Sequence, residues 1–380
     1  MSDPLLRFRD EFPVTETCAY LNHAGMAGLP RRSVERLKAL ADTVSRTGDR
    51  LWTERNAEVK RVRGLAARLL GARDPREVTF VENTSTGLSM IAEGFDWRPG
   101  DNVVSADLEF PSNVYPWMRL ADRGVEYRTV PERDGRIDLD ELLSRIDGRT
   151  RMLALSSVQY ASGFRSDLVR LGEACREQGV LFVVDAIQSL GALRHDVEAE
   201  RIDVCAAASH KWLLGPEGMG VLYISDRVID RFRPVRSGWR SMRESFQWTE
   251  FKVDWNEGAK RMESGTLNVY GIVALGGSLE ILLEAGPDAA ERRILALAGR
   301  AAEGLAALGF DLISSRRPGE TSGIVSAVHP RHAAEGLVKR LADRDVVVAA
   351  RAGRFRVSPH FYNTEGEVER MLRETEEIAG

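Results

Sequence analysis

Residues 209–220 read Ser209-His210-Lys211-Trp212-Leu213-Leu214-Gly215-Pro216-Glu217-Gly218-Met219-Gly220. This stretch follows a short apolar run, Val204–Ala208, and ends in a glycine-rich turn. Lys211 is one of only six lysines in 380 residues, and it alone stands between such a run and such a turn. A lysine held there can form a Schiff base with a carbonyl compound if its surroundings keep the amine partly neutral. An isolated lysine is more often a surface residue, so the remaining sequence has to decide between the two.

Composition narrows the class of protein. Hydrophobic residues make up 43% of the chain and charged residues 29%, which is typical of a globular protein, and the length favours two domains. The net charge of -4, with basic and acidic residues interleaved, gives no electrostatic case for a nucleic acid or an anionic membrane as partner. The three scattered cysteines predict neither a disulfide framework nor a metal site. No membrane-spanning run and no signal peptide is visible, so we expect a cytoplasmic protein.

Seven short apolar runs alternate with helical patterns between about residues 55 and 225. Several runs are apolar almost throughout, which is typical of parallel strands covered by helices on both faces. The pattern therefore predicts an α/β fold with a large, doubly wound, mostly parallel sheet. The predicted strands are Val78–Val81, Asn102–Ser105, Glu126–Val130, Met152–Ser156, Val180–Asp185, Val204–Ala208 and Val221–Ile224.

The last third of the chain shows a different order of predicted helices and strands. A long apolar helix is predicted from about Asn268 to Glu284, and the pattern restarts after Gly286-Pro287. Helices and strands then alternate over about 95 residues, which predicts a small C-terminal α+β domain. We expect a large domain over 16–285 and a small domain over 286–380 joined by residues 1–15. The predicted elements are helices 289–308, 332–342 and 365–378, and strands 310–314, 324–328, 346–350 and 354–358.

Asp185 ends the predicted strand before the lysine strand, where ligands of open α/β sheets gather. An apolar strand that ends in Asp is common, so the residue alone indicates little. Together with Lys211 it matches the needs of pyridoxal phosphate (PLP), whose ring nitrogen stays protonated beside a buried carboxylate and whose aldehyde needs a lysine. Gln188 then either donates to the phenolic oxygen of the ring or merely begins a helix.

Other residues suit the phosphate and the flat ring of such a cofactor. A strand, a hydroxyl-rich turn with Thr84 and Ser85, and a helix start follow one another at residues 78–91. Backbone N–H groups and hydroxyls at a helix start bind phosphate, although simple N-caps look the same. Ser209 and His210 are further candidate donors. Phe110, at the end of another strand, is a candidate to stack on the ring, with a core position as the alternative.

In this order, the motifs resemble the class V aminotransferase group of fold-type I PLP enzymes, which includes the cysteine desulfurases. The matching segments are Tyr20-Leu21-Asn22-His23-Ala24, residues 109–117, Val184-Asp185-Ala186-Ile187-Gln188-Ser189, the lysine run, and Tyr362-Asn363-Thr364-Glu365. The resemblance implies that Lys211 is the Schiff-base lysine, Asp185 the pyridinium partner and Gln188 the partner of the ring oxygen. It implies phosphate contacts from Thr84, Ser85 and His210.

The same resemblance implies residues beyond the cofactor. Arg356 matches the arginine that binds the substrate carboxylate, and His23 lies in a segment that often borders the site. Glu263-Ser264-Gly265-Thr266 resembles the segment whose Thr266 reaches the phosphate of a neighbouring subunit, which implies a homodimer with shared active sites.

Four departures from the family pattern bear on which of the family's reactions we expect. The loop before Arg356 lacks the nucleophilic cysteine of cysteine desulfurases, which disfavours a cysteine-dependent desulfurase because a persulfide needs a thiolate. Phe110 replaces a stacking histidine and Tyr160 replaces an asparagine near the cofactor. Ala208 replaces a phosphate-contacting serine, for which Ser209 is the candidate substitute.

We therefore expect an aminotransferase-like PLP enzyme acting at Cα of an amino acid or amino-acid conjugate. A cysteine-independent β-lyase (C–S lyase) and an isopenicillin N epimerase-like racemase remain alternatives, because all three reactions share their early steps. A non-catalytic PLP-binding scaffold is the remote alternative.

Overall fold

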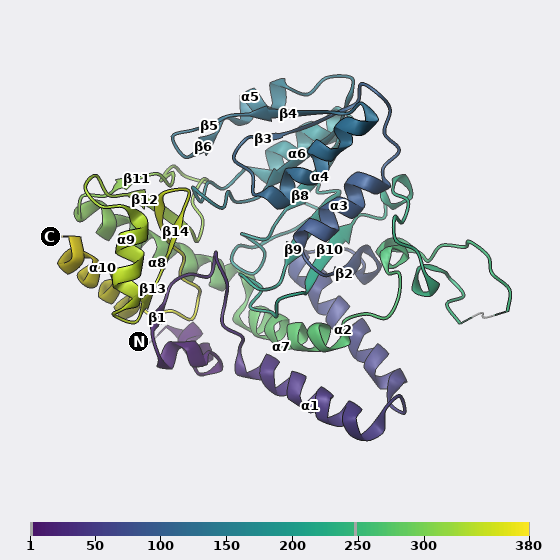
Figure 1. The fold of residues 1–380 in the computed structure, drawn as a ribbon, viewed down its shortest axis with the longest axis horizontal. Coiled ribbons are helices and arrows are strands. Elements are labelled where there is room, and N and C mark those ends of the chain that lie inside the picture. Colours follow the sequence, from purple (N-terminus) through teal and green to yellow (C-terminus); the bar gives the residue numbers. More distant parts are fainter. Residues whose placement is uncertain (1–2, 247–248, 380) are drawn as a thin grey trace.

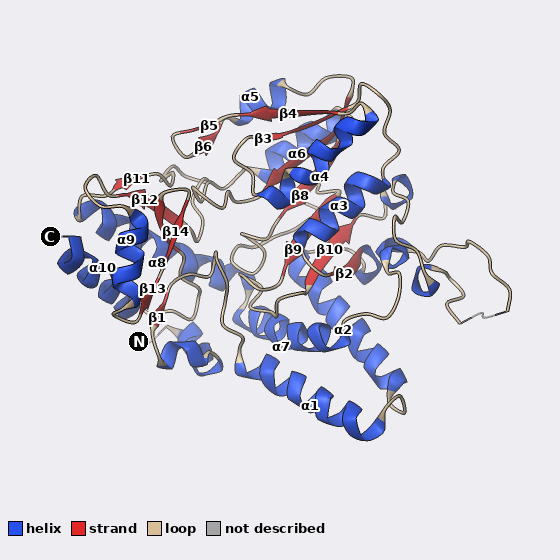
Figure 2. Ribbon diagram, viewed as in Figure 1, coloured by secondary structure: helices blue, strands red, loops and turns tan. Residues whose placement is uncertain are grey.

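The computed structural model describes residues 3–246 and 249–379, drawn as ribbons in Figures 1 and 2. Within these residues, seven strands form one sheet in the order β2-β10-β9-β8-β7-β3-β4. Neighbouring strands are parallel except for β10, which is antiparallel to both β2 and β9. The predicted large, mostly parallel sheet is confirmed. Its strands are β2 (Val78–Val81), β3 (Asn102–Ala106), β4 (Glu126–Val130), β7 (Thr150–Ser156), β8 (Leu181–Asp185), β9 (Val204–Ala208) and β10 (Gly220–Ile224).

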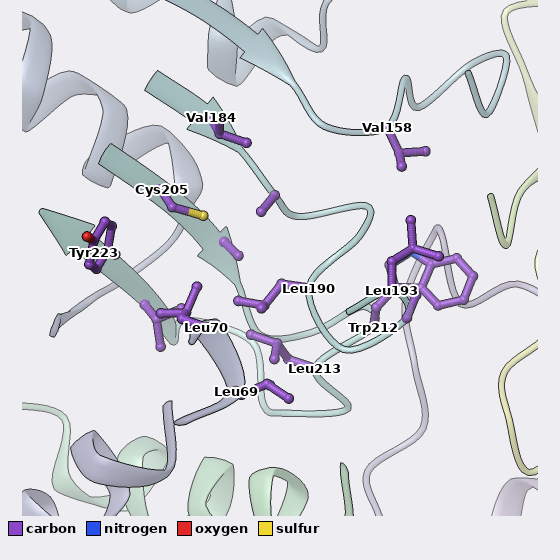
Figure 3. Close-up of a cluster of buried hydrophobic side chains, with 14 of the residues drawn as sticks. Leu69, Leu70, Val158, Val184, Leu190, Leu193, Cys205, Trp212, Leu213 and Tyr223 are labelled. Atoms are coloured by element: carbon purple, nitrogen blue, oxygen red, sulfur yellow. The ribbon is translucent and has the colours of Figure 1, made fainter. Parts of the chain in front are cut away.

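Alternate residues of the central strands enter two separate cores, one on each face of the sheet. Val183 and its same-face neighbours pack with helices α3 (Thr84–Gly94) and α4 (Tyr115–Met118). Val184 and its neighbours pack on the other face with α2 (Trp52–Leu70), α6 (Leu168–Glu177) and α7 (Val269–Ala285). Figure 3 shows part of this second cluster, in which Val184 lies with side chains from the adjacent strands and from the end of α2. Burial on both faces explains why these strands are apolar throughout.

Helix α7 is buried along almost its whole length beneath the large sheet, as Figure 1 shows, and α1 (Arg31–Thr47) packs against its outer side. The two helices approach closely at Gly277, where an added Cβ would lie 2.9 Å from the backbone nitrogen of Ser33. The hydroxyls of Ser33 and Ser278 are 2.8 Å apart at the same crossing. Small residues at this point therefore allow α1 to join the large unit.

The C-terminal part forms a separate mixed unit at the left of Figure 1. An antiparallel sheet in the order β11-β12-β15-β14 is covered by three helices. The predicted single strand 346–350 is wrong, because the chain divides there between two sheets: β13 pairs with β1, and β14 with β15. The elements are β1 (Ala19–Tyr20), α8 (Pro287–Ala307), β11 (Asp311–Leu312), β12 (Val325–Val328), α9 (Ala334–Ala342), β13 (Val346–Val347), β14 (Ala349–Arg351), β15 (Arg354–Val357) and α10 (Glu365–Ala379).

The join between the two units is a sharp bend, since α7 and α8 meet at 84° around Gly286. The N-terminal segment lies against the C-terminal unit, where Phe12 stacks on Tyr362 with ring centroids 3.6 Å apart. The domain limits 16–285 and 286–380 remain a prediction. Among the described residues, no single helix is long and apolar enough to cross a membrane.

Short elements complete the large unit. The segment that follows β3 is only partly α-helical. Helix α4 ends at Met118, and a 3-10 helix, Arg119–Arg123, continues to Gly124, whose positive φ of 73° stops it. The remaining elements are β5 (Glu132–Arg133), β6 (Arg136–Ile137) and α5 (Leu139–Ser144).

Candidate active site

Lys211 lies in the loop that follows β9, held in a tight turn. Leu214 donates its backbone N–H to the carbonyl of Lys211 at 3.0 Å, and Gly215 donates to Ser209 O at 2.8 Å. Gly215 fits only because it lacks a side chain, since an added Cβ would lie 2.7 Å from Cβ of Ser209. The lysine side chain is 8% exposed, and burial lowers the pKa of its amine although Asp185 opposes the shift. The turn therefore presents an amine that loses its proton more readily than a surface lysine.

Asp185 ends β8, next to the strand that leads to Lys211. Its Oδ1 accepts the backbone N–H of Ile187 at 2.9 Å, whereas Oδ2 has no hydrogen-bond partner in the described part of the chain. Burial raises the pKa of this carboxyl, and the charge of Glu109 raises it further. A buried carboxylate oxygen without a partner is costly, and the protonated nitrogen of a pyridine ring would satisfy it.

The N-terminus of α3 borders the same space. Asn83 caps the helix by accepting the N–H of Thr86 at 2.9 Å, and the Thr84 hydroxyl accepts the N–H of Ala208 at 3.0 Å. The hydroxyls of Ser85 and Ser112 lie 2.6 Å apart. This helix start, tied to the end of β9, offers hydroxyls and the positive end of a helix dipole to a phosphate.

Aromatic rings form one wall. Lys211 Nζ lies 5.4 Å from the centroid of the Phe110 ring, which is 39% exposed. Tyr160 meets Phe110 edge to face, with centroids 5.3 Å apart and planes at 79°. The structure thus brings both predicted residues beside the lysine, where Phe110 offers an open ring face.

Gln188 is held with its amide orientation fixed. Its Oε1 accepts the indole N–H of Trp212 at 3.0 Å, and its Nε2 donates to Ala24 O at 3.1 Å. Because an indole N–H can only donate, the acceptor and donor ends of the amide are settled. Nε2 carries a second hydrogen, and Gln188 lines the cavity, so its donation to a ring oxygen stays a prediction.

Arg356, on β15, is the buried cation of the site. Only 1% of the residue is exposed, and Nη1 donates to the carbonyl of Tyr160 at 2.8 Å. Nε and Nη2 have no hydrogen-bond partner among the described residues. Burial, with a further contribution from Arg351, lowers the pKa of this guanidinium. Two buried donors without acceptors, on one planar group, suit a carboxylate that binds both.

Residues from each of these groups except Asp185 line one cavity of about 320 Å³, and Asp185 binds the backbone N–H of the lining residue Ile187. Sequence reasoning missed several of its lining residues. Arg351 precedes Arg354 and Arg356 in an arginine-rich segment, and only the sheet pairing shows that it reaches this cavity. The lining residues not predicted are Ala24, Gly25, Asn83, Ser112, Ile187, Ala208 and Arg351. His210 lines the cavity as predicted.

Besides Asp185, three predicted site residues do not line this cavity. The Ser209 hydroxyl is used within the lysine turn, 2.5 Å from Pro216 O, so the expectation of a phosphate contact is corrected. His23 is also corrected, because it is fully buried and its two ring nitrogens bind Ser358 O at 2.9 Å and the Tyr362 hydroxyl at 2.6 Å. Thr266 lines a separate pocket of about 230 Å³, and its contact with another subunit remains a prediction.

A larger cavity of about 690 Å³ lies elsewhere, lined by Ser189, His195 and Glu200 among others. Its polar groups already bind one another: Ser189 Oγ lies 2.8 Å from His195 Nε2, and His195 Nδ1 lies 3.0 Å from Glu200 Oε2. In the part of the chain described, none of the residues that line this cavity has a buried polar side-chain atom without a partner. Arg356, which has two such atoms, lines the lysine cavity, and Asp185, which has one, binds the N–H of its lining residue Ile187. The smaller cavity is therefore the candidate active site.

No group of three or more potential metal ligands occurs in residues 3–246 and 249–379. The three cysteines all lie in these ranges, and none lines the lysine cavity. Burial raises the pKa of Cys175 and of Cys205 above the usual thiol range. The cavity therefore has no thiolate of its own.

Comparisons with known proteins agree with this geometry. The family model "Aminotransferase class-V" matches residues 19–373. A probable cysteine desulfurase of Pyrococcus abyssi is 29% identical over 97% of this chain and 96% of its own length. The uncharacterized aminotransferase YcbU of Bacillus subtilis is 27% identical, with the same coverage. The apo structure of a cysteine desulfurase from Thermococcus onnurineus superposes with a TM-score of 0.91 at 27% identity, covering 100% of this chain and 98% of that one. The cystine C-S lyase C-DES, in complex with its product cysteine persulfide, shares the fold (TM-score 0.90, 24% identity, 96% and 99% coverage).

Proposed function

Because the chain belongs to the class-V aminotransferase family of fold-type I, PLP-dependent enzymes, we propose that it acts at Cα of an amino acid or amino-acid conjugate by an aminotransferase-like reaction. The observation that carries this proposal is the buried guanidinium of Arg356, which lines the same cavity as Lys211 and has only one of its three nitrogens hydrogen-bonded within the described chain. A carboxylate bound to Nε and Nη2 of Arg356 would place the rest of an amino acid beside the lysine.

Each side chain then has a separate task. Bound PLP supplies the aldehyde that reacts with an amine and a ring that accepts electrons from Cα. Asp185 holds the proton on the ring nitrogen, Gln188 donates to the ring oxygen, and Phe110 covers the ring. Thr84, Ser85 and His210, with the start of α3, bind the phosphate. Lys211, with its pKa lowered by burial, takes the proton from Cα and returns it.

A β-lyase reaction on a sulfur-containing amino acid is the second candidate. Relatives with 27–29% identity are named cysteine desulfurases, yet none of the three cysteines lines the cavity. Elimination of a sulfur leaving group needs the same lysine and no cysteine nucleophile, so this alternative suits a relative that lacks the thiolate.

The visible absorption spectrum of the PLP-loaded protein separates the two candidates. Amino acids are added one at a time without any keto acid. We expect the absorption of the PLP form to disappear, with one equivalent of keto acid released per site. Continuous release of keto acid and ammonia would instead establish the lyase. Absence of any PLP-dependent band after reconstitution would overturn both.

A homodimer with shared sites belongs to the same proposal. Several large apolar side chains are exposed on the single chain, among them Met26, Tyr115 and the lining residue Phe110. A second copy that covers them would bring Thr266 within reach of the other phosphate site. Sedimentation equilibrium tests the dimer, and a weaker PLP affinity of Thr266→Ala tests the shared site.

Arg351 predicts a preference for substrates with a second anionic group. The two other arginines of this segment already have a role or a partner. Arg356 lines the cavity as the proposed carboxylate ligand, and Arg354 pairs with Glu132 at 2.8 Å. Arg351 also lines the cavity and is exposed, so its guanidinium can meet a second carboxylate. We expect Arg351→Ala to weaken inhibition by succinate about 3- to 5-fold and to leave inhibition by propionate unchanged, because an exposed ion pair contributes little. An equal loss for both inhibitors would contradict the assignment.

A further inference from the structure

Glu109 is a buried carboxylate that immediately precedes Phe110 of the candidate site; it begins the matching segment 109–117, but none of the roles proposed above uses it. It is 5% exposed and precedes Phe110, the residue that faces Lys211. Its Oε1 accepts the backbone N–H of Ser156 at 2.7 Å and the Nε2 amide of Gln159 at 2.7 Å. The Ser156 hydroxyl donates to Oε2. Two N–H donors on Oε1 and a hydroxyl on Oε2 suit an ionised carboxylate.

These hydrogen bonds connect the segment that carries Phe110 to the segment that carries Tyr160. Gln159 begins a tight turn in which its own carbonyl accepts the N–H of Gly163 at 2.8 Å. Tyr160, the next residue, meets the Phe110 ring edge to face, and its backbone carbonyl accepts a hydrogen bond from Arg356 Nη1. Glu109 therefore ties the backbone that carries Phe110 to the backbone that orients the guanidinium.

The same carboxylate lies in the electrostatic surroundings of the reacting groups. Ser156, which it binds, is paired with Asp185 in the register of β7 and β8. The charge of Glu109 contributes to the raised pKa of Asp185 and to that of Tyr127 on β4. Burial raises the pKa of Glu109 itself, and its bonds to Ser156 and Gln159 oppose this rise.

We propose that Glu109 is a positioning residue of this site: its hydrogen bonds hold Phe110 and the Tyr160–Arg356 contact in place, and its negative charge raises the proton affinity of the groups around the ring. The inference rests on the proposed function, since it assumes that PLP and a carboxylate occupy the cavity. Glu109 acts through Phe110, Arg356 and Asp185 and touches neither substrate nor cofactor.

Two variants separate the charge from the geometry. Glu109→Gln keeps the oxygen that accepts from Ser156 N and Gln159, and its amide can donate to the Ser156 hydroxyl, so the walls stay in place without the charge. Glu109→Ala removes the bonds as well. Ser156→Ala removes only the hydroxyl bond and serves if the alanine variant at 109 fails to fold. Glu77→Gln is the matched control, because Glu77 is 3% exposed and accepts two backbone N–H groups, at 3.0 and 3.3 Å, outside the residues that line the cavity.

The first readout is the pH titration of the visible band of the PLP-loaded protein. Removal of a nearby negative charge lowers the proton affinity of the chromophore, so we expect Glu109→Gln to move the midpoint to lower pH by about 0.5 to 1 unit. Glu77→Gln should leave the midpoint unchanged. A midpoint for Glu109→Gln equal to that of the parent would overturn the electrostatic part of the proposal.

The second readout is the affinity for succinate, measured by calorimetry on the PLP-loaded protein without turnover. We expect Glu109→Gln to bind succinate within about twofold of the parent, and Glu109→Ala or Ser156→Ala to bind it at least about fivefold more weakly, because Arg356 loses its fixed backbone partner. Unchanged affinity in all three would overturn the positioning role. If the parent itself shows neither a band nor succinate binding, the proposed function fails, which is distinct from failure at Glu109.

Discussion

Replacement of Lys211 by alanine is expected to abolish turnover, with a loss of at least about 10³-fold in kcat. A positioned acid or base contributes about 10²- to 10⁴-fold, and this residue would also supply the covalent link to the cofactor. The prediction rests on the burial of the amine, which lowers its pKa, and on its place 5.4 Å from the Phe110 ring. The measurement is kcat for the best substrate of the amino-acid panel, with PLP in excess so that weaker cofactor binding does not limit the rate.

Lys260 provides the matched control. Burial also lowers the pKa of its amine, but it lies in the 3-10 helix Gly258–Met262 and does not line the cavity. Lys260→Ala should therefore keep kcat within about twofold of the parent. A Lys211→Ala protein that turns over at the parental rate would exclude every PLP mechanism considered for this cavity.

The large sheet was predictable because its strands are buried on both faces. Val180–Asp185 and Val204–Ala208 are apolar runs of the right length between turn residues, and the strands β8 and β9 differ from them by at most one residue. Residues 346–350 are apolar in the same way, yet they contribute to two strands whose partners belong to different sheets. A run of valines indicates extended backbone but carries no information about which strand it will pair with.

The site was predictable where a residue type is tied to a backbone position. Lys211 in a glycine-rich turn and Arg356 beside a family motif line one cavity, and Asp185 at a strand end binds the backbone N–H of the lining residue Ile187. Ser209 and His23 fail for a common reason: their polar atoms bind the chain itself, at Pro216 O and at Ser358 and Tyr362. Whether a buried polar group is satisfied internally depends on contacts distant in sequence, and Ser358 lies 335 residues from His23.

Asp185→Asn should reduce catalysis and stabilise the cofactor-free protein at the same time. Asparagine keeps the acceptor for the Ile187 N–H, and its amide nitrogen takes the place of Oδ2, which already lacks a partner in the described chain. Only the charge is lost. Removal of one member of a buried ion pair costs about 3 to 5 kcal/mol, so with PLP bound we expect kcat to fall by roughly 10²- to 10³-fold.

Without PLP the buried charge of Asp185 destabilises the folded protein. Burial raises the pKa of Asp185 above its usual value of 3.8, so the unfolded chain releases this proton at lower pH than the folded one. A group with a raised acid pKa therefore destabilises the folded state increasingly as the pH rises from about 4 towards the raised value. We expect Asp185→Asn to increase the free energy of unfolding of the cofactor-free protein by on the order of 1 kcal/mol, with a larger gain at pH 8 than at pH 5.

Denaturant unfolding of both proteins at pH 5 and pH 8, with and without PLP, measures these effects. Asp203 is the control, because it is also buried with a raised pKa but already binds Phe182 N at 2.9 Å and Arg227 at 3.0 Å. Asp203→Asn should lower stability and leave kcat nearly unchanged, since its partners are structural. Loss of stability in Asp185→Asn without PLP would mean that the carboxylate is satisfied within the chain, and the case for a cationic ring beside Oδ2 would then fail.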